Sequence, residues 1–150
     1  MSLQTKDITK ICGFYASSYH LAVMLLPYIS KKLERGEKIV PILEKEIENE
    51  IETLVNKINI TNDLKKEILK INWKNTNNLN IEDLKEKGKI EVIITGDEES
   101  IRKKNRELEN MKNISIINLF NLEEKNNMAQ ILANYDYIIN TSGVHEKEAI

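Results

Sequence analysis

The chain has 150 residues, of which 22 are basic and 24 acidic, and a net charge of −2. The lack of a basic excess argues against a nucleic-acid partner. The single cysteine, Cys12, excludes an internal disulfide and a cysteine-based metal cluster. The longest apolar stretch, residues 21–29, is about half the length of a membrane span, and no secretory signal is recognised. We therefore expect a cytoplasmic protein without a membrane partner.

The chain opens with a predicted strand and helix. Residues 8–15 form an apolar run typical of a strand, and the spacing of apolar residues over 18–35 predicts a helix. Pro27 lies in the middle of this helix and is expected to kink it or to start a second segment, because proline lacks the backbone donor. The residues expected to cap the helix are Ser17 or Ser18 at its start and Gly36 at its end.

The rest of the chain continues to alternate between strands and helices. Residues 38–43 predict a strand at a sheet edge, because Pro41 cannot donate a hydrogen bond to a neighbouring strand. The remaining expected elements are helices at 44–58, 61–71, 97–111 and 122–135, one or two helical turns at 81–88, a polar loop at 72–80, strands at 89–95, 114–120 and 135–140, and a turn with a candidate final helix from 141.

This alternation predicts a three-layer α/β/α fold with a mainly parallel sheet of five strands, because parallel strands need crossover connections. The first, third, fourth and fifth strands are apolar almost throughout, as burial on both faces requires. The edge position of the second strand favours a doubly wound, Rossmann-like order 2-1-3-4-5. No repeat or low-complexity linker divides the chain, so residues 1–150 are expected to form a single α/β domain.

The fold class indicates where a ligand would bind. Open parallel sheets bind ligands beyond the carboxyl ends of their strands, where the strand order reverses. With the order 2-1-3-4-5, this crevice lies between the first and third strands, and small polar residues follow several strands. The candidate ligand-binding residues are Gly13, Tyr15, Ser17, Ser18, His20, Thr95, Asp97 and Asn140, with Gly96, Asn118, Asn121, Thr141 and Ser142 also on the expected rim.

The segment "GFYASSYH", residues 13–20, lies between a predicted strand and a predicted helix, where a phosphate-binding loop would lie. A Walker loop has glycine, four residues and then Gly-Lys-Ser/Thr. Only Gly13 matches, because Ser18, Tyr19 and His20 occupy the last three positions. The lysine that reaches the phosphates and the hydroxyl that holds magnesium are therefore missing.

This segment and the apolar helix "HLAVMLL" that follows it resemble the corresponding parts of RecA-like and KaiC-like ATPases. The strand "YDYIIN" is similar to their strand with an acidic metal-holding end, but it ends in Asn140 and carries Asp136 at its start. The chain looks most like degenerate RecA-like sensory domains of the MEDS type, mainly over residues 8–45. The resemblance implies a non-catalytic sensory or regulatory domain with a degenerate P-loop and no cofactor. It also implies a small-molecule ligand or a protein partner, with a homodimer as a candidate assembly.

Several candidate residues also have structural explanations. Ser17 and Ser18 are expected to cap the helix, because no G-x-S-x-G motif marks either as a nucleophile. The acidic residues 97–99 either bind a cation or, as we favour, stabilise a helix start. His20 is a candidate anion ligand or base, so a small-molecule or nucleotide-binding enzyme that uses this turn is the alternative function. No metal site is predicted, because His20 and His145 lack carboxylates at ligand spacing.

Overall fold

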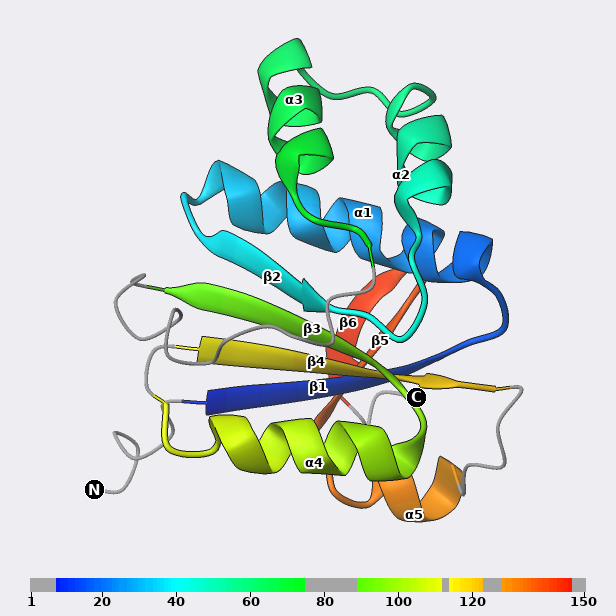
Figure 1. Ribbon diagram of the computed structural model, residues 1–150, viewed down its shortest axis with the longest axis vertical. Helices are drawn as coiled ribbons and strands as arrows, with labels where there is room; N and C mark the ends of the chain where they lie inside the picture. Colours follow the sequence, from blue (N-terminus) through cyan, green and yellow to red (C-terminus); the bar gives the residue numbers. More distant parts are fainter. Residues whose placement is uncertain (1–7, 75–88, 112–113, 123–127, 147–150) are drawn as a thin grey trace.

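The computed structural model describes residues 8–74, 89–111, 114–122 and 128–146. Their strands form one sheet in the order β2-β3-β4-β1-β5-β6 (Figure 1). All neighbouring strands are parallel except β5 and β6, which form an antiparallel hairpin. The strands are β1 (Ile8–Tyr15), β2 (Lys38–Ile42), β3 (Ile90–Gly96), β4 (Ile114–Asn121), β5 (Tyr137–Asn140) and β6 (Gly143–Glu146).

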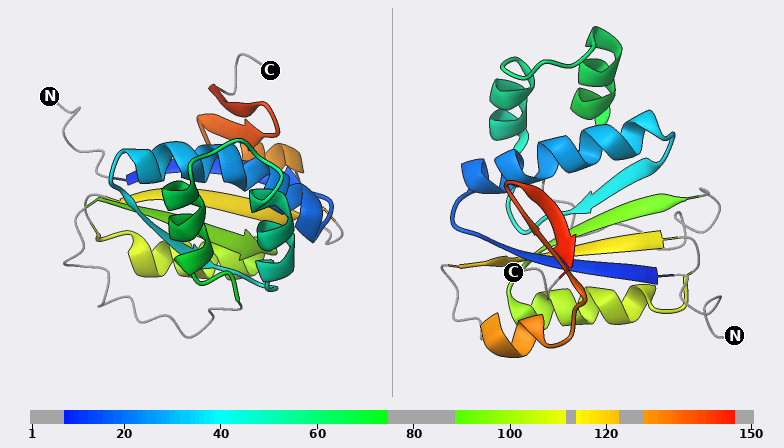
Figure 2. Two further views of the ribbon diagram at one scale, coloured as in Figure 1. Left: turned by 90° about the horizontal axis from the view of Figure 1, so that it is seen from above. Right: turned by 180° about the vertical axis from the view of Figure 1, so that it is seen from behind.

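Helices cover both faces of this sheet, which confirms the predicted three-layer α/β class. The helix α1 (Ser18–Glu34) lies on one face and carries α2 (Glu48–Val55) and α3 (Asn62–Lys70) on its outer side. The helices α4 (Glu98–Leu108) and α5 (Met128–Leu132) lie on the opposite face (Figures 1 and 2). Among the described helices, none is both long enough and apolar enough to span a bilayer.

The strands supply one apolar core to each face of the sheet. In β3, Ile93 packs in the core beneath α1, whereas Val92 and Ile94 pack in the core against α4. This division follows the two-residue period of a strand. The strands β3 and β4 are buried along their whole length, which explains why their sequences are apolar almost without interruption.

The predicted order of the strands is wrong, although the predicted edge position of β2 is confirmed. The strand β2 pairs only with β3 in the sheet, and Pro41 stands opposite Ile93. The strand β1 pairs with β4 and β5, so β4 lies between β1 and β3. The sequence did not reveal this, because the buried strands are similarly apolar and do not distinguish one neighbour from another.

The first helix forms as a single element, so of the two outcomes expected at Pro27, a kink or a second segment, the second segment does not occur. Pro27 has no backbone N–H, so the carbonyl of Val23, four residues earlier, lacks its intrahelical donor. Both residues are exposed, Val23 to 37%, so water can bond to this carbonyl. The end of the helix is as predicted. Gly36 has a φ of +80°, and its amide donates to the carbonyl of Leu33 at 2.9 Å.

Two further differences concern the ends of elements. The helix expected over 44–58 begins only at Glu48, and of the helix expected over 122–135 the structure shows α5, with 123–127 outside the described residues. Residues 143–146 form the strand β6 where a turn and a helix were expected. This strand lies at a sheet edge with alternate residues exposed, so it lacks the apolar run that marks a buried strand. The turns expected at 81–88 lie outside the described residues.

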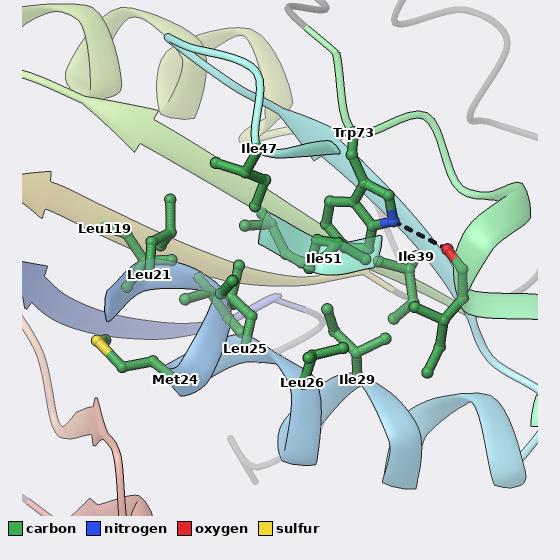
Figure 3. Packing of buried hydrophobic residues seen from close by; sticks show 14 of the residues in the cluster. Leu21, Met24, Leu25, Leu26, Ile29, Ile39, Ile47, Ile51, Trp73 and Leu119 are labelled. Atoms are coloured by element: carbon green, nitrogen blue, oxygen red, sulfur yellow. Dashed lines mark hydrogen bonds between the residues drawn. The ribbon is translucent and has the colours of Figure 1, made fainter. Parts of the chain in front are cut away.

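The start of the expected polar loop at 72–80 is anchored in the core. The side chain of Trp73 is only 1% exposed and packs among residues of α1, α2 and β2 (Figure 3). Its indole Nε1 donates a hydrogen bond to the carbonyl of Ile68 at 2.8 Å. Trp73 therefore ties the segment after α3 to the layer formed by α1, and the rest of the expected loop, 75–80, lies outside the described residues.

Candidate functional site

A small pocket lies at the carboxyl ends of β1, β3 and β4. The strands β1 and β4 are neighbours, but the helix after β1 covers one face of the sheet and the helix after β4 covers the other (Figure 1). This divergence creates a crevice of the kind that binds ligands in open α/β sheets. The pocket is lined by Tyr15, Ala16, Ser17, Ser18, Leu21, Lys45, Ile47, Thr95 and Asn121.

Local hydrogen bonds close the turn between β1 and α1. Only Ala16 and Ser17 connect the strand to the helix. The amide of Ala16 donates to Nδ1 of His20 at 3.0 Å, and the amide of His20 donates to Oγ of Ser17 at 3.1 Å. Ser17 is thus the helix cap, as expected. Two of the amides that a phosphate-binding loop would direct at its ligand are engaged within the turn itself.

Among the described residues that line the pocket, Lys45 is the one with a cationic side chain, and no sequence pattern pointed to it. It is exposed and lies in the segment between β2 and α2. The amide of the preceding residue, Glu44, donates to Oγ1 of Thr95 at 2.8 Å, which fastens this segment beside the end of β3. The ammonium of Lys45 and the positive end of the α1 dipole together favour a negatively charged occupant.

The volume of the pocket limits what it can hold. It measures about 50 Å³. Sites for drug-sized ligands and cofactors occupy roughly 300–1,000 Å³, so a whole nucleotide does not fit. The space is suited to a few water molecules or to one small anion.

Gly13 lies inside β1, two residues before the strand ends, and does not line the pocket. A Cβ atom at this position would lie 2.7 Å from Cγ2 of Ile139 and 2.8 Å from Cδ2 of Leu119. Contacts this short are not tolerated, so glycine allows side chains of β5 and β4 to pack across β1. Packing alone therefore accounts for the glycine.

Asp97 and Asn140 also lie outside the pocket lining and have local roles. Asp97 caps α4, because its Oδ1 accepts from the amide of Ser100 at 2.8 Å, in agreement with the favoured interpretation. Asn140 orders the β5–β6 turn, where its Oδ1 accepts from the amide of Ser142 at 2.9 Å.

On the opposite face of the sheet, Asn118 is fully buried and donates to the hydroxyl of Tyr135 at 2.6 Å. Burial raises the pKa of Tyr135, so this hydroxyl stays protonated.

The pocket brings together five residues of the expected rim, which are Tyr15, Ser17, Ser18, Thr95 and Asn121. The candidates Gly13, His20, Asp97 and Asn140 do not line it.

Neither a metal-binding cluster among the described residues nor a similar protein assigns a function to this site. Within residues 8–74, 89–111, 114–122 and 128–146, no three His, Cys, Asp or Glu side chains are placed to hold a metal ion. No protein-family model, no curated protein and no solved structure matches the chain. The function is therefore inferred from the sheet topology and from the β1–α1 turn.

Proposed function

We propose that the chain is a non-catalytic sensory or regulatory α/β domain of the cytoplasm, a degenerate relative of RecA-like ATPases that has lost the phosphate-binding motif. One observation carries the proposal, namely that the β1–α1 turn is closed on itself. The amides of Ala16 and His20 are both used within the turn. Tyr19, which stands where the phosphate-binding lysine would be, is 41% exposed and supplies no positive charge.

The central position of β1 in the sheet supports the proposal. The strand β1 lies between β4 and β5, with β3 and β2 following beyond β4. In doubly wound α/β folds the first strand-to-helix turn holds the phosphates of a nucleotide, so a turn in this position without the binding residues fits a degenerate nucleotide-binding domain. The pocket of this chain lies at the corresponding end of β1.

The energetics of phosphate binding favour a role without ATP hydrolysis. Charge-assisted hydrogen bonds to phosphate are about twice as strong as neutral ones, and the turn offers none from position 19. A pocket of about 50 Å³ also leaves no space for the ribose and base. A domain of this kind acts by binding a small molecule or a protein, with a second copy of the chain among the candidate partners.

The test is to measure ATP binding by isothermal titration calorimetry and ATP hydrolysis by phosphate release, each with magnesium present. We expect no binding heat and no turnover above a boiled control. Hydrolysis that Ser17→Ala or His20→Ala abolishes would overturn the proposal, because both residues would then belong to a working nucleotide site.

The position of Lys45 favours a second candidate, a small-molecule or nucleotide-binding enzyme that uses the same turn. Lys45 lines the pocket together with Ser17 and Ser18 at the start of α1, so its ammonium can take the place of the missing lysine at position 19. This candidate predicts that inorganic phosphate or ATP stabilises the protein against heat and that Lys45→Ala removes the effect. The control is Lys57→Ala, which removes an exposed lysine beyond the end of α2.

A further inference from the structure

A larger groove lies between α1 and the β5–β6 hairpin, away from the β1–α1 turn. We call it the α1–hairpin groove, and it is formed by one stripe of α1 from residue 24 onward, by Arg35 directly after the helix, and by residues 141–144 of the hairpin. Its volume of about 320 Å³ is within the range of small-molecule sites. Figure 2 shows the hairpin passing beside α1 on the side of the sheet opposite β2.

The helix supplies the groove with a gradient from apolar to cationic. Met24 and Pro27 lie toward the middle of α1, and Lys31 and Arg35 follow on the same face because residues three and four apart are neighbours on a helix. Within the described part of the chain, neither Lys31 nor Arg35 is ion-paired. Val144, which is 36% exposed, adds an apolar side chain from β6.

The hairpin side of the groove is held in place before any ligand binds. Oδ1 of Asn140 accepts from both the amide and the hydroxyl of Ser142, at 2.9 and 2.7 Å. The amide oxygen of Asn140 can only accept, so the Ser142 hydroxyl uses its one proton in the bond to Asn140. In the contact of 2.9 Å between this hydroxyl and Nε2 of His145, the donor is therefore the imidazole. His145 therefore does not activate Ser142 as a nucleophile, and this pair positions the turn. Preorganisation of this kind lowers the cost of binding.

Lys32, a third cation that lines the groove, is already paired with two buried acids. Nζ of Lys32 lies 3.6 Å from Oε1 of Glu91 and 3.8 Å from Oε1 of Glu37, so its charge is already largely balanced. It also covers the ring of Tyr28 at 5.2 Å from the centroid. Among the described residues that line the groove, the unbalanced positive charge is thus that of Lys31 and Arg35.

We propose that the α1–hairpin groove binds a small organic carboxylate with an apolar body. The carboxylate lies near Lys31 and Arg35, where the guanidinium can bind it through two parallel hydrogen bonds. The apolar body packs on Met24, whose flexible side chain adapts to different shapes, and on Pro27 and Val144. This inference rests on the proposed function only in that a sensory domain needs a ligand.

The experiment titrates the ¹⁵N-labelled full chain with octanoate and follows the amide signals by NMR. We expect saturable shifts confined to the second half of α1 and to residues 141–145. Two further compounds are titrated to test each part of the ligand separately. 1-Octanol keeps the apolar body without the charge, and inorganic phosphate keeps a negative charge without the apolar body. Each is expected to bind at least about tenfold more weakly than octanoate, because each loses one class of contact.

Charge reversal tests whether the named side chains are responsible. The double variant Lys31→Glu and Arg35→Glu should weaken octanoate binding about tenfold or more. The control is Lys66→Glu with Lys70→Glu, which makes the same kind of change at the same spacing on exposed positions of α3. Val144→Trp fills the groove without changing its charge and should weaken octanoate while leaving phosphate unaffected.

Three results would overturn the inference. They are octanoate shifts that are absent or located elsewhere, equal effects of the two double variants, and phosphate or 1-octanol binding as tightly as octanoate. The ATP measurements at the β1–α1 turn remain independent of these outcomes. A failure in the groove therefore leaves the non-catalytic role standing, and ATP hydrolysis would leave the groove result standing.

Discussion

The backbone amide of Ala16 donates to Nδ1 of His20 across 3.0 Å, which makes the imidazole part of the β1–α1 turn. The bond requires the tautomer of His20 whose proton is on Nε2. The amide of His20 in turn donates to Ser17, so the two residues fix each end of the same short connection. His20 therefore has a structural role that does not depend on any ligand.

Substitution of His20 should reduce stability. His20→Ala removes the acceptor for the Ala16 amide, and we expect a loss of about 0.5–1.5 kcal/mol in the free energy of unfolding. Urea denaturation followed by circular dichroism measures it, with Tyr19→Ala as the control at the exposed neighbouring position. Unchanged stability would contradict the structural role of His20 and would strengthen its case as a ligand-binding residue.

A methyl group at Gly13 should destabilise the sheet. Its Cβ would come within 2.8 Å of side-chain atoms of Ile139 and Leu119, so Gly13→Ala forces two strands to adjust. Such overpacking costs about 1–3 kcal/mol, and thermal unfolding will show it as a lower Tm. Ser18→Ala, at the first position of α1, is the control and should change little. If Gly13→Ala were as stable as the control, packing would not explain the glycine.

The sequence predicted the alternation of strands and helices because apolar runs and helical spacing are local features. It also predicted the edge position of β2, since Pro41 lacks a backbone donor wherever the strand pairs. Strand order is different in kind. The neighbour of β1 is β4 rather than β3 because of contacts such as that of Gly13 with Leu119. These contacts join residues far apart in the sequence, and no pattern within either strand predicts them.

The residues of the candidate site differ in the same way, since some were predicted from local patterns and others depend on contacts between distant segments. Ser17 and Thr95 were found because they lie at or just after the carboxyl ends of strands, and these ends meet at one edge of a parallel sheet. Lys45 was missed because its place at the pocket depends on tertiary contacts, such as the bond from the amide of Glu44 to Thr95, which require β2 to lie beside β3. The α1–hairpin groove was missed as well, because no strand was predicted at 143–146.

Trp73 provides both a probe and a test of the outer helical layer. It is the only tryptophan and is buried, so its emission should move to longer wavelength when the chain unfolds. Trp73→Phe removes the hydrogen bond to Ile68 and should cost about 1–3 kcal/mol, measured by circular dichroism because the fluorophore is lost. Leu69→Ala, at a position that is 45% exposed, should cost less than about 0.5 kcal/mol. Equal losses would mean that Trp73 is not an anchor.

Glu91 gives the protein a predicted dependence of stability on pH. It is fully buried in β3, and burial raises its pKa, against the opposing effects of Tyr28, Lys32 and Ser115. Burial and the negative charge of Glu91 also raise the pKa of Tyr28 well above its usual range. The carboxyl of Glu91 therefore holds its proton to a higher pH in the folded chain than in the unfolded chain.

The sign of the effect follows from proton binding. Between the usual pKa of 4.5 and the raised folded value, the folded chain binds more protons than the unfolded chain, so the Glu91 contribution is complete below this window and is lost as the pH rises through it. Glu91→Gln removes the titrating group, so the variant should gain stability relative to the wild type as the pH increases. Urea denaturation at a series of pH values from 4 upward, at constant ionic strength, measures the difference, and Glu99→Gln, at an exposed position of α4, is the control. Parallel pH profiles for Glu91→Gln and the wild type would show that burial does not raise the pKa of this carboxyl.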